Sequence, residues 1–79
     1  MATLPTAEDA RRVVLDELGA MGVRPNESIN LLALNSRILG KFKLKASELA
    51  DGLDLMKANG EIVQGQHAEL LTAAGYAAI

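Results

Sequence analysis

The chain has 79 residues and a hydrophobic fraction of 49%, which suits one small globular domain and argues against a disordered segment. Its formal net charge is −2 and its pI about 5.2. This balance disfavours a dedicated nucleic-acid binder, because neutralisation of phosphates supplies most of the affinity of such proteins. The sequence contains no cysteine, which excludes disulfides, thiolate metal ligands and a cysteine nucleophile, and fits a reducing compartment.

The N-terminal sequence has no basic stretch followed by an apolar run, so we expect no signal peptide. No apolar run approaches the roughly 20 residues that span a bilayer. We therefore expect a cytoplasmic protein without membrane association, folded as a single domain over residues 1–79. A chain this short buries only roughly 60% of its unfolded surface, so dimerisation would add stability.

Residues 1–5 are predicted to form a flexible arm that precedes the first helix. Thr6 followed by Glu8 and Asp9 is typical of a helix N-terminus, where the cap side chain and the helix dipole favour these residues. Gly19 and Gly22 are predicted to end the helix. Between these signals, apolar residues recur at helical spacing on one face: Ala10, Val13, Val14, Leu18 and Met21.

A second helix is predicted after the connection at residues 23–26, capped by Asn26 or Ser28 and continuing to about Leu39, with Gly40 ending it. Its apolar residues are Ile29, Leu32, Leu34, Ile38 and Leu39. The segment 28–32 is ambiguous. A short strand before the helix, with Asn30 or Asn35 as the cap, is the alternative, and one continuous helix is the preferred interpretation.

In the turn at residues 40–45, Phe42 and Leu44 alternate with lysines and are expected to pack into the core. A third helix is predicted over residues 45–59, ended by Gly60. Its core face contains Ala46, Leu49, Leu53 and Met56. Gly52 lies in the middle of this helix, where it costs ~1 kcal/mol relative to Ala. A close approach of another backbone would explain its presence.

A β-hairpin and a short helix are predicted to complete the chain. Ile62 and Val63 start the first strand and Gly65-Gln66 forms a two-residue turn. The return strand contains Ala68, Leu70 and Leu71, and Thr72 caps a terminal helix with Ala73, Ala74, Tyr76 and Ile79. The predicted class is α+β, mainly α: three helices, a two-stranded hairpin and a short C-terminal helix.

The second half of the chain resembles winged helix-turn-helix proteins, in which a helix ended by Gly precedes a hairpin that closes in a Leu-Thr-x-x-Gly turn. The residues that carry the resemblance are Leu53, Gly60 and Ile62, then Leu70-Leu71-Thr72 and Gly75. More narrowly, the chain is similar to a group of small uncharacterised bacterial proteins that read Asn-x-Arg-Phe, Asp-Phe-x-x-Gly-Leu and Lys-Gly-Trp. Here Ile38 and Leu49 replace the Phe residues and Glu61 replaces Trp. The resemblance implies a winged-helix-like domain, and that group of proteins supplies no activity that could be transferred to this chain.

In winged helix-turn-helix regulators the exposed face of the third helix enters the major groove. Here that face would present carboxylates, which repel phosphates, and the hairpin contains no Lys or Arg. The candidate nucleic-acid contacts are therefore basic residues in and before the turn: Arg37, Lys41, Lys43 and Lys45. A solvated loop is the simpler interpretation of this cluster, and Arg11 and Arg12 on the first helix are likewise expected to be surface residues.

The third helix suggests a different site, an apolar residue surrounded by acids that would suit a protein partner or a second copy of the chain. The candidate residues are Glu48, Asp51, Asp54, Leu55 and Ala58. A single scattered surface leucine is the competing interpretation of Leu55.

Catalytic and metal-binding residues are scarce. His67 is the only histidine, and its neighbour Glu69 is expected to make an exposed contact with it rather than an acid–base pair. One imidazole without cysteine makes a weak zinc site, and no glycine-rich phosphate loop is present. We therefore expect no enzyme, no metal and no cofactor. The leading hypothesis is a non-catalytic interaction module that acts through the third helix on a protein or on itself. The alternative is a small DNA-binding regulator that uses the basic turn.

Overall fold

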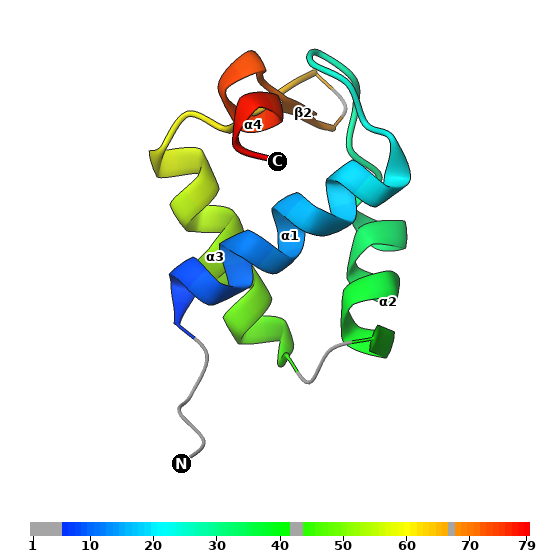
Figure 1. Cartoon of the computed structure of the whole chain (residues 1–79), viewed down its shortest axis with the longest axis vertical. Helices are drawn as coiled ribbons and strands as arrows, with labels where there is room; N and C mark the ends of the chain where they lie inside the picture. Colours follow the sequence, from blue (N-terminus) through cyan, green and yellow to red (C-terminus); the bar gives the residue numbers. More distant parts are fainter. Residues whose placement is uncertain (1–5, 42–43, 67) are drawn as a thin grey trace.

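Four helices and one hairpin make up the domain in a computed structural model, which describes residues 6–41, 44–66 and 68–79 (Figure 1). The elements follow in the order α1 (Ala7–Met21), α2 (Leu31–Lys41), α3 (Ala46–Ala58), β1 (Ile62–Gln64), β2 (Glu69–Leu71) and α4 (Ala73–Ala78). The predicted α+β class, mainly α, is confirmed. The arm predicted at residues 1–5 lies outside the described residues, as does Phe42 of the predicted core pair.

Helix α1 begins and ends at the expected kinds of residue. The Thr6 hydroxyl accepts a hydrogen bond from the Asp9 amide (3.1 Å), and the Thr6 amide donates to the Asp9 carboxylate (2.9 Å), which forms a capping box. Gly22 ends the helix in the left-handed conformation, with φ 72°. Gly19, predicted to share this role, instead lies within the last turns of α1.

The preferred continuous helix over 28–39 is wrong, and the alternative with an extended segment before it is correct. Ser28 forms a bridge with Leu70, and the Ile29 amide donates to the Glu69 carbonyl (2.8 Å). Residues 28–29 pair with the open edge of β2, and this pairing satisfies backbone amide and carbonyl groups that would form hydrogen bonds within the helix if the helix began earlier. Asn30 is the helix cap, because its side-chain oxygen accepts from the Ala33 amide (3.1 Å).

The hairpin has strands at the predicted places. Ile62 pairs with Leu71 and Gln64 with Glu69. Gly65, predicted to lie in the turn, donates its amide to the Ala68 carbonyl (2.8 Å), so these two residues face each other across the hairpin. Thr72 then caps α4 by accepting from the Gly75 amide (3.0 Å), as predicted.

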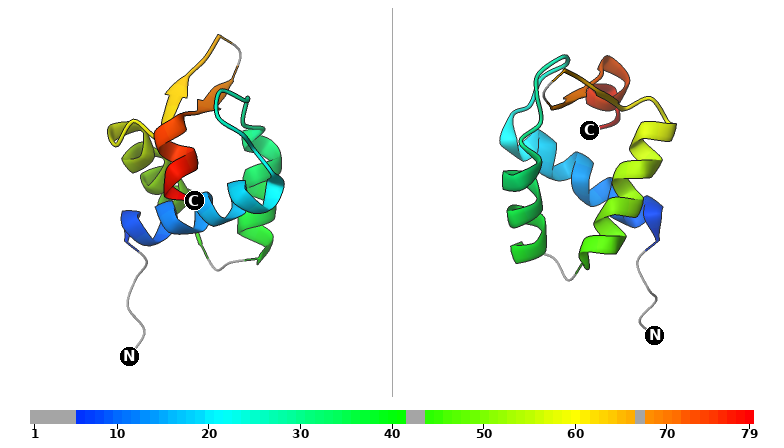
Figure 2. Two further views of the ribbon diagram at one scale, coloured as in Figure 1. Left: turned by 45° about the horizontal axis from the view of Figure 1, so that its top comes forward. Right: turned by 180° about the vertical axis from the view of Figure 1, so that it is seen from behind.

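The core forms where α1 crosses α2 and α3, with the hairpin closing one end (Figures 1 and 2). It consists of aliphatic side chains and one methionine: Val14, Leu15, Leu18, Ile29, Leu34, Ile38, Leu49, Met56, Ile62 and Leu71. The predicted close approach at Gly52 is present. A Cβ atom at Gly52 would lie 2.7 Å from the Ala10 Cβ and 2.9 Å from the Arg11 backbone nitrogen. Gly52 therefore fixes the spacing of α1 and α3.

We predict that Gly52→Ala destabilises the domain by about 1–3 kcal/mol, because the added methyl group would overlap the backbone of α1. Gly40→Ala is the matched control, since a Cβ there meets no atom within 4 Å. That change should be neutral or stabilise by about 0.5–1 kcal/mol through helix propensity. Chemical denaturation of both variants measures the difference, and equal effects would contradict the close packing of α1 on α3.

Candidate interaction surface

Three glutamates are buried, and each is paired with cations from another part of the fold. They are Glu17 on α1, Glu61 before β1 and Glu69 on β2. A carboxylate removed from water needs a partner of opposite charge, so these residues determine where several cations must lie. Apolar periodicity in the sequence gives no sign of a buried acid, so the burial of these three glutamates was not predicted.

Glu17 binds two of the four predicted nucleic-acid contacts. The Arg37 Nε donates to Glu17 Oε1 at 2.8 Å, and the Lys41 Nζ lies 3.1 Å from the same oxygen. These two hydrogen bonds, with Arg37 the larger effect, hold the pKa of Glu17 below its ordinary value. Arg37 and Lys41 therefore fasten α2 to α1. Both side chains remain partly exposed, at 42% and 55%.

The predicted basic patch is therefore only partly assembled. Lys45 is exposed at the start of α3 and has no ion pair within the described residues. Lys43, the fourth predicted contact, lies outside them. Two cations that share one carboxylate, with Lys45 nearby in sequence, leave a small positive excess at this end of the molecule.

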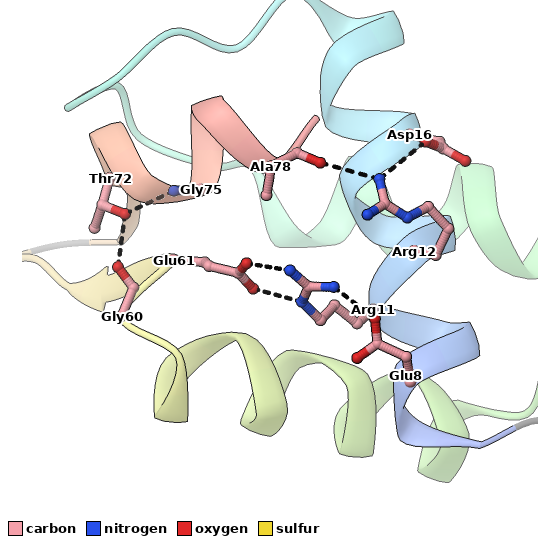
Figure 3. Close-up of polar contacts among 9 residues, drawn as sticks. All are labelled: Glu8, Arg11, Arg12, Asp16, Gly60, Glu61, Thr72, Gly75 and Ala78. Atoms are coloured by element: carbon pink, nitrogen blue, oxygen red, sulfur yellow. Dashed lines mark hydrogen bonds and ion pairs between the residues drawn. The ribbon is translucent and has the colours of Figure 1, made fainter.

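Glu61 is held by Arg11, so the prediction that Arg11 is a surface residue is wrong (Figure 3). The Arg11 Nε donates to Glu61 Oε1 at 2.7 Å, and its Nη2 donates to Oε2 of the same carboxylate. The Nη1 atom reaches Glu8 at 2.6 Å. This bidentate pair lowers the pKa of Glu61 and raises that of Arg11. It joins α1 to the residue that precedes β1.

Two further cations also have internal partners. Lys57 of α3 lies 2.6 Å from Glu69, and this hydrogen bond raises the pKa of Lys57. Glu69 thus faces α3 and is buried, so the prediction that it makes an exposed contact is wrong for Glu69. Its predicted partner, His67, lies outside the described residues. Arg12 remains exposed, as predicted, and donates to the Ala78 carbonyl at 3.0 Å (Figure 3).

The protein-contact site predicted on α3 is divided between two rows of side chains. Asp51, Asp54 and Ala58 are exposed, together with Ser47 and Ala50. Glu48 and Leu55 lie on the neighbouring row that contains Gly52, which faces α1, and both are half-buried. The expectation that Leu55 is an exposed apolar contact is therefore wrong.

Glu48 also has a local structural role. Its carboxylate accepts from the Lys45 amide at 2.8 Å and satisfies one of the unpaired backbone groups at the start of α3.

Asp51 and Asp54 differ from every other carboxylate of the chain. Neither side chain has a hydrogen bond, or a cation within 4.0 Å, among the residues that the structure describes. The other acidic residues cap a helix, bond a backbone amide or take part in an ion pair: Glu8, Asp9, Asp16, Glu17, Glu27, Glu48, Glu61 and Glu69. The outward face of α3 thus carries mostly small side chains and two carboxylates without an ion pair among the described residues. Lys57, which binds Glu69, acts on Asp54 only through a longer-range coulombic interaction.

Searches of the described residues found no group of three His, Cys, Asp or Glu side chains that could hold a metal ion. They also found no helix long and apolar enough to span a bilayer. Two shallow hollows lie elsewhere: one of about 420 Å³ beside Tyr76 and Ile79, and one of about 460 Å³ beside Ser28 and Leu31. Comparisons of the chain with protein-family models, curated proteins and solved structures found no match.

We predict that acid weakens the domain through its paired glutamates. Because the pKa values of Glu17 and Glu61 are lowered by folding, their contribution is fully present above the unfolded-state pKa of about 4.3 and is lost as the pH falls through the lower folded-state values. Thermal melts should show that Glu17→Gln lowers the Tm at pH 7, and that the difference from the unmodified protein shrinks below about pH 4.

Asp16→Asn is the control for this experiment. Asp16 is exposed next to Glu17, and its cation, Arg12, lies 3.9 Å away. Its removal should change the Tm little at any pH. A difference between Glu17→Gln and the unmodified protein that stays constant down to pH 2.5 would contradict an ionised, paired Glu17.

Proposed function

We propose that this protein is a non-catalytic interaction module on a winged-helix scaffold, and that the outward face of α3 binds a basic surface of another protein. The order of three helices, hairpin and short helix supports the scaffold. It makes α3 the helix before the hairpin, which is the helix that such domains present to their partners. A cytoplasmic location belongs to the same proposal.

The unpaired state of Asp51 and Asp54 is the observation that carries this proposal. Folding gives the other carboxylates a partner inside the domain, whereas these two project from one exposed face of α3. Ser47, Ala50 and Ala58 surround them with short side chains, so a partner's cations can reach the carboxylates without steric obstruction. Complementary charge of this kind steers association and fixes the orientation of a complex.

The alternative function, binding of DNA through Arg37, Lys41, Lys43 and Lys45, receives less support. Arg37 and Lys41 already neutralise Glu17, and releasing them would leave a buried carboxylate unpaired. Docking of α3 into a groove would bring Asp51 and Asp54 against phosphates. The hairpin sequence, residues 62–71, supplies no Lys or Arg to offset that repulsion.

The non-catalytic part of the proposal rests on the residue types available. The sequence has no cysteine and one histidine, and the paired carboxylates have structural partners. Ser47 lies one turn from Asp51 on α3, but no histidine is present among the described residues to act as the general base that usually activates a serine nucleophile.

We predict that the double change Asp51→Asn and Asp54→Asn weakens binding of a fluorescent lysine-rich peptide about three- to tenfold, because two exposed ion pairs are lost. Fluorescence anisotropy at 50 and 300 mM salt measures this effect, and salt should weaken binding to the unmodified protein. The double change Glu8→Gln and Asp16→Asn is the matched control. It removes the same charge from exposed positions on α1 and should leave the affinity within about twofold.

Two outcomes would count against this function. An equal loss in the α1 control would show that the peptide responds to net charge and not to α3. Micromolar binding of a duplex that falls steeply with salt and disappears in Lys45→Glu would favour the nucleic-acid alternative.

A further inference from the structure

An exposed apolar stripe lies on α2. Leu32 is 80% exposed and Leu39 is 43% exposed. The two leucines are two helical turns apart, so they share one flank of the helix, about 10 Å from each other along its axis. Asn35 and Ser36 lie between them. The Asn35 side-chain oxygen is enclosed and has no hydrogen-bond partner among the described residues. The two leucines are thus left uncovered by the described part of the domain, whereas the Asn35 oxygen is enclosed and is not part of the exposed surface.

This stripe and the acidic face of α3 are turned to the same side of the molecule. Leu34 and Ile38 on α2, and Leu49 and Met56 on α3, are the buried residues that pack into the core shared with α1. At about 100° per residue, Leu32 lies nearly opposite Leu34, as Asp51 does opposite Leu49. The right-hand view of Figure 2 shows α2 and α3 side by side with α1 behind them. The leucines and the carboxylates therefore lie on the outward sides of two neighbouring helices.

We infer that the partner is a basic amphipathic helix, whose apolar side packs on Leu32 and Leu39 and whose lysines or arginines reach Asp51 and Asp54. This inference rests on the proposed function for the two carboxylates and adds the form of the partner. An amphipathic helix presents apolar residues at i and i+7, the spacing of Leu32 and Leu39. Its long cationic side chains cover apolar surface with their alkyl chains and place their charges beyond it.

A second copy of this chain fits the surface less well. A matching helix needs both an exposed apolar stripe and cations without partners. Arg11, Arg37, Lys41 and Lys57 all bind glutamates of their own chain, and Lys45, which has no ion pair among the described residues, lies at the start of α3 and not on the helix that carries the stripe. Helix α2, the one helix known to carry the stripe, has its arginine and its terminal lysine directed to Glu17. Complementarity of charge therefore favours a different, basic chain.

The test uses two synthetic peptides of identical composition. One is an 18-residue leucine–lysine sequence with leucines at helical spacing, and the other is a scrambled version without amphipathic order. Fluorescence anisotropy against the intact protein should give an affinity for the ordered peptide about tenfold higher than for the scrambled one. Leu32→Ser should remove most of that preference, because a central apolar contact is lost. Circular dichroism should show that the ordered peptide gains helix on binding.

Controls and contrary outcomes separate this inference from the proposed function. Val63→Ser, which removes from β1 an apolar side chain about as exposed as Leu39 (45% against 43%), should preserve the preference. Leu39→Ser provides a second variant if Leu32→Ser does not fold. Equal affinity for both peptides, or an unchanged preference in the folded leucine variants, overturns the inference. In that case the double change Asp51→Asn and Asp54→Asn decides about the proposed function: if it still weakens binding of both peptides, the proposed function of α3 stands without the inference about the form of the partner. Sedimentation as a dimer that Leu32→Ser dissociates would assign the stripe to a second copy and would also overturn the inference.

Discussion

The arrangement of cations in this domain depends on three glutamates that folding removes from water. Each carboxylate needs an opposite charge, and the cation always comes from a different element: Arg37 and Lys41 for Glu17, Arg11 for Glu61 and Lys57 for Glu69. These pairs join α2 to α1, the start of the hairpin to α1, and the end of the hairpin to α3. In a domain with a small aliphatic core, they fix the relative positions of helices that apolar contacts alone would hold less specifically.

This internal use of cations has a consequence for the surface. A net charge of −2 would mean little if charges of both signs were scattered evenly over the exterior. Here most of the described cations face inward or lie along the chain's own carboxylates, so the negative charge that lacks a partner is concentrated on Asp51 and Asp54. A surface of this kind attracts basic groups and repels phosphates, which is why we propose a protein partner and not nucleic acid for this domain.

The sequence predicted those features whose signals are local. Thr6, Gly60 and Thr72 could be assigned because each acts within a few residues of itself, and the helices followed from their periodicity. The extended segment at Ser28 depends on β2, and Arg11 meets Glu61 fifty residues away, so neither could be read from its neighbours. On the candidate site, Asp51 and Asp54 were predicted correctly as exposed acids. Leu55 was not predicted correctly, because the limits of the buried face depend on how closely α1 approaches.

Gly52 connects that packing detail to the proposed surface. Its missing side chain lets the backbone of α1 approach α3 on one flank, and this contact sets how α3 is rotated about its axis. The row that contains Glu48, Gly52 and Leu55 is therefore drawn toward α1, and the row that contains Ser47, Asp51 and Asp54 faces outward. A helix rotated by one position would bury an aspartate and expose Leu55. The exposure of Asp51 and Asp54 on α3 is thus a consequence of packing at a glycine on another flank of the same helix, and the core specifies the proposed interaction surface.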